Sequence, residues 1–297
     1  MNWESRQINH SLLLVTLVAL SLLPLAGCLS VGRPSKRHRE EAAARGAKEL
    51  VAHRSKPEKV TFLVVAGDRP ASFEVSSNDH KIQIHFNFVD PKGTHWLATG
   101  ISEDGYLMTV AHFPRRERYY VVGWMDGKPA FAPARVVYKK LGREFGEDLA
   151  ILHVDKHLDC PIQLGTLDSA ENETYAFGLD WKSGGKYITM DRQSGGKFIV
   201  VAGKVVHRPK PIPGKDISIL VTDLPLWRGD SGGAVMSKDG KLVGVFIGVD
   251  IPLATLKASR IACVPDMDRV LSIIGKDRLK ANEPNKSLQP TAAAPGS

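Results

Sequence analysis

The sequence predicts an all-β fold, an antiparallel barrel or sandwich that ends in a short helix. Short apolar segments recur along the chain, turn residues separate them, and the best of them alternate apolar with polar side chains. With 297 residues, 43% of them hydrophobic, the chain can bury a substantial core. Setting aside both ends leaves about 215 residues, which suits a single all-β domain.

Turn residues divide the chain into predicted hairpins. Three Asp-Gly pairs, at 104–105, 126–127 and 239–240, favour the tight turns that join antiparallel strands. Residues 82–88 alternate strictly between apolar and polar side chains, as a half-buried strand does. The full series of predicted strands covers residues 82–88, 96–100, 106–110, 119–124, 130–138, 149–154, 175–179, 198–206, 233–236 and 242–249.

The C-terminal region is predicted to contain one helix and then a disordered tail. Residues 267–274 form the helix, with Asp266 as its N-cap. Residues 276–297 are assigned to the tail, because the chain becomes rich in Pro, Ala, Ser and Asn from Lys280 onward, without periodicity.

Residues 1–27 are predicted to be a bacterial lipoprotein signal peptide. A polar start is followed by an apolar stretch at 12–25 that is short for a membrane span. The Leu-Ala-Gly-Cys run ending at Cys28 resembles a lipobox, which implies cleavage before Cys28 and acylation of that cysteine. Leu29 as the next residue implies anchoring in the outer membrane, facing the periplasm. A plain secretory signal with an incidental cysteine stays the alternative.

Residues 28–59 are predicted to be a basic, lipid-anchored tether. Between Arg33 and Lys59 there are nine Lys and Arg residues against four Glu, which accounts for most of the net charge of +8. The segment holds no aromatic residue to stack on bases, so we expect no nucleic-acid partner. It also holds few large apolar residues, which favours a solvated, partly helical spacer near anionic lipid head groups.

Ser231 is the leading candidate for a nucleophile because glycines bracket it. In the run Gly229-Asp230-Ser231-Gly232-Gly233 the backbone N–H groups of Gly229 and Ser231 are suited to form an oxyanion hole. Taken alone, this run is also compatible with an ordinary surface turn.

Two residues upstream complete the chemistry that Ser231 needs. His112 ends a predicted strand and serves as the base that takes the serine proton, and Asp148 begins another and orients the imidazole. The order His, Asp, Ser is that of the chymotrypsin class of peptidases. This chemistry needs no cofactor, and the three cysteines lie too far apart in the sequence for a zinc site.

Beyond the three candidate triad residues, a family resemblance is carried by motifs at residues 102–112, 125–130, 148–155, 221–223, 239–244 and 261–265. On these motifs the chain from about Lys81 to Ile274 resembles the trypsin-like serine peptidases, and within them the protease domain of the HtrA/Deg branch. The resemblance implies two packed six-stranded antiparallel β-barrels with the triad between them. It implies a serine endopeptidase that cuts envelope polypeptides through an acyl-enzyme, and it is compatible with a homo-oligomer.

The resemblance also sets the expected domain boundaries. The protease domain is assigned to residues 60–275, with one barrel over about 60–158 and the other over about 159–275. Only about 23 residues follow Ile274, so we expect no PDZ domain in this chain.

Two residues in the loop before Ser231, Arg228 and Asp230, differ from their family counterparts in identity or in surroundings. Arg228 stands where the branch usually has proline. It is expected to be a solvent-exposed side chain, with stabilisation of the oxyanion loop, or a loop that needs a partner to order, as the alternatives. Asp230 resembles the residue that pairs with a freed N-terminus in trypsin, but here a tether precedes the domain, so that activation route is not expected.

Substrate contacts and the cysteines complete the expectations. The resemblance implies that Ile247, Gly248 and Val249 pair with an extended substrate, and Val249 favours small aliphatic side chains before the cut bond. Cys160 and Cys263 are predicted either to form a disulfide or to remain two buried thiols.

A second function stays open beside the active enzyme. A catalytically silent or partner-activated pseudopeptidase would keep the barrels as a peptide-binding module. The presence of His112, Asp148, Ser231 and both glycines favours the enzyme, because degenerate peptidases commonly lose one of them.

Overall fold

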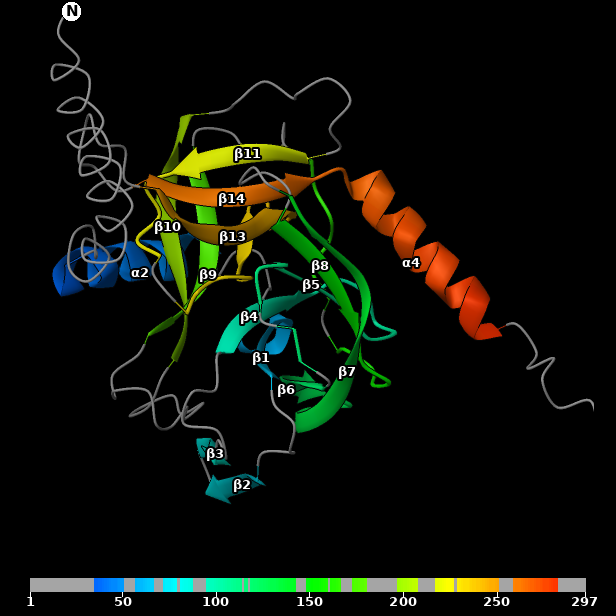
Figure 1. Ribbon diagram of the computed structural model, residues 1–297. Coiled ribbons are helices and arrows are strands. Elements are labelled where there is room, and N and C mark those ends of the chain that lie inside the picture. The colour runs from blue at the N-terminus through cyan, green and yellow to red at the C-terminus, as the bar shows by residue number, and fades with distance from the viewer. Residues whose placement is uncertain are drawn as a thin grey trace, which may run out of the picture.

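Two closed antiparallel β-barrels lie side by side in a computed structural model of the chain (Figure 1). Each barrel has six strands, so the predicted pair of six-stranded barrels is confirmed. The structure describes residues 35–50, 57–66, 72–78, 81–87, 95–113, 115–116, 118–142, 148–159, 161–166, 173–180, 197–207, 217–226, 229–250 and 259–282.

The first barrel has the strand order β1-β4-β5-β8-β7-β6. The hairpin that joins β6 to β7 turns at Asp126 and Gly127, whose φ angles are 51° and 75°. Two positive φ angles in a two-residue loop match the twist of paired strands, which confirms the Asp-Gly turn predicted there. The strands are β1 (Thr61–Ala66), β4 (His95–Gly100), β5 (Tyr106–Thr109), β6 (Tyr119–Met125), β7 (Lys128–Leu141) and β8 (Asp148–His153).

The second barrel has the strand order β10-β11-β14-β13-β12-β9. Its shortest strand, β12, pairs with β13 only as far as Val245, whereas β13 continues to Asp250 along β14. Part of β13 therefore extends past its neighbour on one side. The strands are β9 (Glu173–Asp180), β10 (Lys197–His207), β11 (Ile217–Thr222), β12 (Ala234–Met236), β13 (Leu242–Asp250) and β14 (Ser259–Pro265).

The first predicted strand does not belong to either barrel. Residues 82–88 correspond to β3 (Lys81–Asn87), which pairs with β2 (Ser72–Asn78) in a separate two-stranded sheet. The first barrel instead begins with β1, a strand that the sequence analysis did not identify. All six residues of β1 are buried, so it lacks the alternation by which half-buried strands are recognised.

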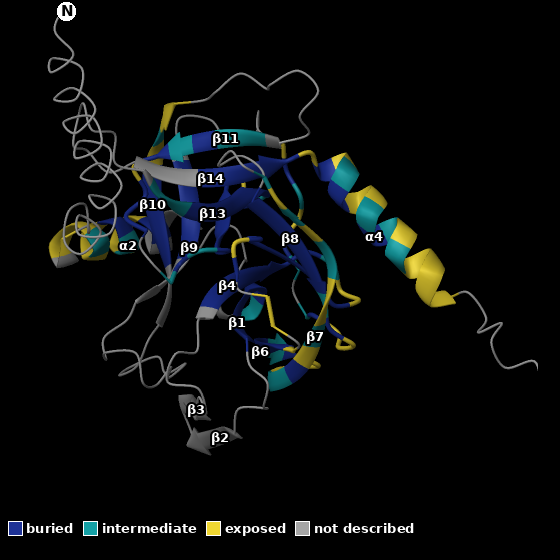
Figure 2. Ribbon diagram, in the orientation of Figure 1, coloured by how far each residue is buried: buried dark blue, intermediate teal, exposed yellow. Residues whose placement is uncertain are grey.

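One large hydrophobic core spans both barrels and the start of the C-terminal helix. Phe62 in the first barrel and Phe177 in the second are fully buried members of it, and Val270 and Ile274 of the helix join them. Figure 2 shows buried residues along the strands of both barrels. Burying one such large side chain contributes about 1.5–3 kcal/mol, so this shared core stabilises the contact between the barrels.

The C-terminal helix α4 (Met267–Asn282) is longer than predicted. Asp266 caps it as expected, because its Oδ1 accepts the Asp268 N–H at 3.0 Å. The helix does not stop at residue 274, so the assignment of residues 276–282 to a disordered tail was wrong. These last turns carry mostly charged side chains and their one large apolar residue, Leu279, is exposed, so hydrophobic periodicity could not reveal them. The remainder of the predicted tail, residues 283–297, lies outside the described residues.

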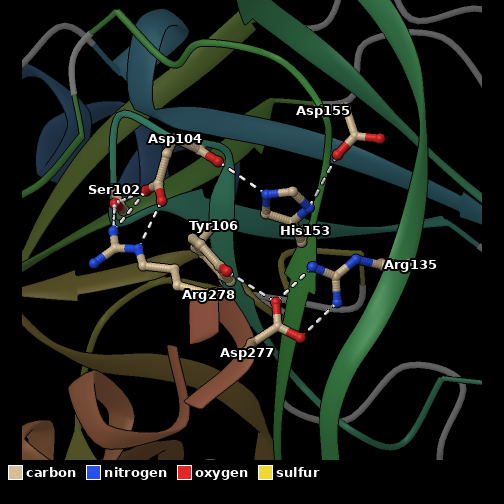
Figure 3. Close-up of polar contacts among 8 residues, drawn as sticks. All are labelled: Ser102, Asp104, Tyr106, Arg135, His153, Asp155, Asp277 and Arg278. Atoms are coloured by element: carbon tan, nitrogen blue, oxygen red, sulfur yellow. Dashed lines mark hydrogen bonds and ion pairs between the residues drawn. The ribbon is translucent and has the colours of Figure 1, made fainter. Parts of the chain in front are cut away.

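Ion pairs hold the end of α4 against the first barrel (Figure 3). Asp277 accepts a hydrogen bond from the Tyr106 hydroxyl at 2.8 Å and pairs with Arg135. Arg278 donates to both carboxylate oxygens of Asp104 at 2.7 Å. Burial, reinforced by Asp277, raises the pKa of Tyr106 to about 12, whereas the bond to Arg135 lowers the pKa of Asp277.

The N-terminal segment contributes helix α2 (Lys36–Leu50), and α3 (Pro57–Val60) precedes β1. Ser35 starts α2, because its Oγ accepts the His38 N–H at 3.1 Å. The helix lies against β10 (Figure 1). Ala42 is 3% exposed, and a Cβ on Gly46 would stand 2.7 Å from the Val200 carbonyl oxygen. The expectation of a solvated spacer was therefore wrong for this part, because small residues let the helix approach the strand closely.

None of the helices in the described ranges is long and apolar enough to cross a membrane. Residues 1–34, with the predicted signal peptide and Cys28, lie outside the described residues. Lipidation of Cys28 therefore stays a prediction.

Candidate active site

His112 and Asp148 are in direct contact at the ends of two paired strands. β5 pairs with β8 in a register that sets Thr109 opposite Ala150, which brings the residues following β5 beside the start of β8. His112 Nδ1 lies 2.5 Å from Asp148 Oδ2. Asp148 Oδ1 accepts the backbone N–H groups of Ala111 and His112 at 2.6 and 2.9 Å. The carboxylate is therefore held in one orientation, and it fixes the imidazole ring in turn.

Glycine is required on both sides of Ser231 by the shape of its loop. Gly229 and Gly232 have φ angles of 93° and 87°, a region that disfavours residues with a Cβ. A Cβ on Gly232 would stand 1.8 Å from the Leu97 carbonyl oxygen, so the loop is pressed against β4. The amides of Gly229 and Ser231 donate to no acceptor within the part of the chain that the structure describes. Those two N–H groups are available to a ligand.

Strand β4 links the serine loop to the strand that leads to His112. Leu97 donates its N–H to the Ser231 carbonyl at 2.7 Å and accepts the Thr109 hydroxyl at 2.6 Å. The structure therefore brings the Ser231 loop and the end of β5 onto the same strand, across the junction of the barrels. Between these described residues, no hydrogen bond joins Ser231 Oγ to the His112 ring. Such bonds are commonly long before substrate binds.

An aromatic cluster that the sequence analysis missed holds the residue after His112. The Phe113 ring stacks on Trp96 with centroids 5.0 Å apart and meets Tyr119 edge-on at the same distance. Lys139 donates to the Phe113 carbonyl at 2.9 Å and lies 3.7 Å from its ring centroid. Burial lowers the pKa of the Lys139 amine. These residues are scattered in sequence, so no spacing could have shown that they support the His112 segment.

The three predicted substrate contacts lie on the part of β13 that extends past β12. Ile247 is buried, and Gly248 and Val249 are half-buried. Among the described strands, none pairs with this stretch on the β12 side. A Cβ built on Gly248 meets no atom within 4 Å. The geometry leaves room for another extended chain along this edge.

Comparison with known families decides where this fold belongs. The trypsin-like peptidase domain family matches residues 93–245, about half of the chain. The chain belongs to the trypsin-like peptidase family. The matched range contains the candidate triad residues His112, Asp148 and Ser231.

Two curated relatives of this chain are described as DegP-like proteases. A protein of Halomonas elongata described as a probable periplasmic serine endoprotease, DegP-like, is 27% identical over 145 residues, which are 49% of this chain and 27% of the relative. One of Hahella chejuensis with the same description is 25% identical over 146 residues, 49% of this chain and 28% of that protein. The chain thus spans about a quarter of the curated relatives it matches.

A solved structure supports the fold assignment of the peptidase. The HtrA-type protease AlgW with tripeptide superposes on this chain with a TM-score of 0.51 at 16% identity, covering 77% of this chain and 64% of that one. At 16% identity, this similarity shows a shared fold.

Several predicted site residues of the peptidase lie outside the described residues or stay untested. Arg228 and Cys160 are not described. Cys263 is buried on β14, and that burial raises the pKa of its thiol to about 12. The pairing of Cys160 with Cys263 therefore stays a prediction, with two buried thiols as its alternative. Within the described ranges, no cluster of three or more His, Cys, Asp or Glu side chains is arranged to hold a metal ion.

Proposed function

We propose that this chain is a serine endopeptidase that hydrolyses peptide bonds of envelope proteins. The observation that supports this most is the contact between His112 and Asp148, with the glycine-bracketed Ser231 attached through β4 to the same strand end. In this family context, the residue order and the fixed carboxylate match the needs of a serine nucleophile.

In the first half of the reaction Ser231 Oγ attacks the carbonyl carbon of the substrate peptide bond. His112 Nε2 takes the hydroxyl proton, and Asp148 stabilises the resulting imidazolium through Nδ1. The C–N bond then breaks as the imidazolium gives its proton to the leaving amine. The products of this half are a free amine and an ester between Ser231 and the acyl part of the substrate.

In the second half a water molecule attacks the ester carbon. His112 removes a proton from that water, and it later returns the proton to Ser231 Oγ as the acid product leaves. In both halves an oxyanion forms on the former carbonyl oxygen. The amides of Gly229 and Ser231 would receive it, and losing one such donor typically costs about 3 kcal/mol of transition-state stabilisation.

The substrate would bind as an extended strand along Ile247, Gly248 and Val249. The lack of a described neighbour on this edge of β13 supports the assignment, because a polypeptide can add there by backbone hydrogen bonds. The structurally similar AlgW protease was solved with a tripeptide, which supports polypeptide substrates for this chain.

The proposed location is the bacterial envelope, at the outer membrane facing the periplasm. Acylation of Cys28 would provide the anchor, since several acyl chains suffice for stable membrane attachment. The periplasmic relatives support an envelope location. We keep a homo-oligomer as part of the proposal, because it is common in the HtrA branch.

One observation favours a second candidate, a pseudopeptidase that is silent or needs a partner. Ser231 Oγ and the His112 ring, both within the described residues, are not hydrogen-bonded to each other. If no substrate or partner draws them together, the edge of β13 would still bind peptides without cutting them.

Labelling with a fluorophosphonate probe distinguishes the two candidates. We expect the wild type to be labelled at Ser231 and Ser231→Ala to show no labelling, because only an activated serine attacks the probe. Ser272→Ala is the matched control, since Ser272 is exposed on α4, and it should be labelled as fast as the wild type. No labelling of folded wild type under conditions that label a related peptidase would exclude the active enzyme.

A further inference from the structure

A largely buried ion pair joins the N-terminal helix to the loop of the proposed nucleophile. Arg39 on α2 donates from Nη2 to Asp230 Oδ2 at 3.0 Å and reaches Oδ1 at 3.4 Å. The two side chains are 16% and 1% exposed. A carboxylate this deeply buried is costly without a cation nearby. The docked helix and the serine loop therefore depend on each other, although the two partners are 191 positions apart in the sequence.

Asp230 stands between the two residues whose amides form the proposed oxyanion hole. Its backbone torsions set the direction of the peptide group that carries the Ser231 N–H. Its carbonyl oxygen also accepts the Gly233 N–H at 2.9 Å, which closes the loop. Fixing the Asp230 side chain therefore also fixes the direction of the Ser231 N–H, one of the two proposed oxyanion donors. Losing that direction would weaken transition-state binding while leaving His112 and Asp148 in contact.

The docking of α2 on the second barrel sets the position of Arg39. Arg39, Ala42 and Gly46 share one face of the helix, and the latter two are buried against the barrel. Arg45 adds a hydrogen bond of 2.9 Å to the Ala202 carbonyl of β10. Because the helix contacts β10 at these points, the guanidinium is presented to Asp230 from a rigid element.

We propose that Arg39 is a positioning residue for catalysis. From the docked helix it holds Asp230, and through Asp230 it holds the oxyanion loop in its productive conformation. This inference rests on the proposed peptidase function. It assigns an activating role to a segment whose composition predicts a spacer, and it gives Asp230 a guanidinium partner in place of a freed N-terminus.

The first test compares two substitutions of Arg39 in the full-length protein. Arg39→Met removes the charge and Arg39→Lys keeps a cation. We expect Arg39→Met to lower kcat by at least about tenfold, up to the roughly 10³-fold that accompanies loss of one oxyanion donor, with KM changed less than about twofold. Arg39→Lys should recover part of the loss. The matched control is Arg37→Met, because Arg37 lies on the same helix with 89% exposure and should not change kcat.

A double-mutant cycle shows whether Arg39 acts through Asp230. In an Asp230→Asn background, Arg39→Met should lower kcat by less than about twofold further, because the partner through which it acts is already altered. Gly46→Val gives an independent arm, since its side chain would clash with the Val200 carbonyl and displace α2 while keeping Arg39. It should reproduce the kcat loss of Arg39→Met.

The outcomes separate this inference from the proposed function. A folded wild type that neither labels nor hydrolyses peptides would overturn the peptidase proposal. An active wild type with a folded Arg39→Met variant at wild-type kcat would overturn the role of Arg39 alone. Independent, multiplicative losses in the cycle would also overturn it, because they would mean that Arg39 does not act through Asp230. Removing a pair that only stabilises the fold would lower Tm and leave the turnover of folded molecules unchanged.

Discussion

Replacing Asp148 with asparagine tests how the site fixes the tautomer of His112. The asparagine amide can point in two ways, with its oxygen at the position of Oδ1 or of Oδ2. Two backbone N–H groups lie at 2.6 and 2.9 Å from the first position, and the single ring nitrogen lies at 2.5 Å from the second. A buried donor left unsatisfied costs about 1–3 kcal/mol, so the oxygen will face the two backbone donors.

The amide NH₂ of the variant then faces His112 Nδ1 and requires an acceptor there. The ring proton must move to Nε2, which can no longer accept the proton of Ser231. We expect kcat to fall by roughly 10⁴-fold, equivalent to about 5 kcal/mol of transition-state stabilisation, with little change in peptide binding.

The assay is the rate of fluorophosphonate labelling or of peptide hydrolysis, measured on folded protein well below its Tm. Nitrogen-15 shifts of the His112 ring report the tautomer directly. Asp126→Asn is the control, because Asp126 lies in the β6–β7 turn and bonds to Lys156 at the surface. A loss smaller than about tenfold, or a ring that keeps its proton on Nδ1, would refute the reasoning.

Two further predictions concern the substrate edge and the C-terminal helix. Gly248→Val should raise KM for peptides by at least about tenfold without lowering Tm, because its side chain meets only open space where a substrate strand would lie. The control is Gly275→Ala on α4, which is equally open and should leave KM unchanged. An unchanged KM in Gly248→Val would exclude this edge of β13 as the substrate site. The pKa of Asp277 is lowered from 3.8, chiefly by Arg135, so its contribution to stability is present above about pH 4 and is lost as the pH falls through the lowered value. Urea unfolding should show this acid loss in wild type and a smaller one in Asp277→Asn; identical pH profiles would contradict it.

Local signals in the sequence were sufficient to predict the turns and to single out the glycine-bracketed loop of the candidate nucleophile Ser231. Asp-Gly pairs such as Asp126-Gly127 specify a backbone that few other residues adopt, so their hairpins could be predicted. The glycines around Ser231 are likewise recognisable because the loop needs a positive φ at Gly229 and Gly232. The pairing of β5 with β8 that joins His112 to Asp148 became an expectation only through the family resemblance.

Features that depend on tertiary contacts could not be predicted in the same way. β1 is buried throughout, so its apolar run has no period that marks a strand. Helix α2 docks through Ala42 and Gly46, whose small size looks like a lack of apolar surface until the facing backbone is known. The end of α4 is held by ion pairs of Asp277 and Arg278, and partners of ion pairs are not readable from one sequence.

The docking of α2 changes how far the peptidase can reach from its proposed anchor. A free tether from Cys28 to residue 60 would span up to about 110 Å, at roughly 3.3–3.6 Å per residue. Because the docked segment begins at Ser35, only seven residue steps separate it from Cys28, a maximum of about 25 Å. If Cys28 is acylated, the catalytic domain works within a few nanometres of the bilayer. Its substrates would then be proteins that dwell at the membrane surface, and a longer connection would widen their range without altering a single catalytic residue.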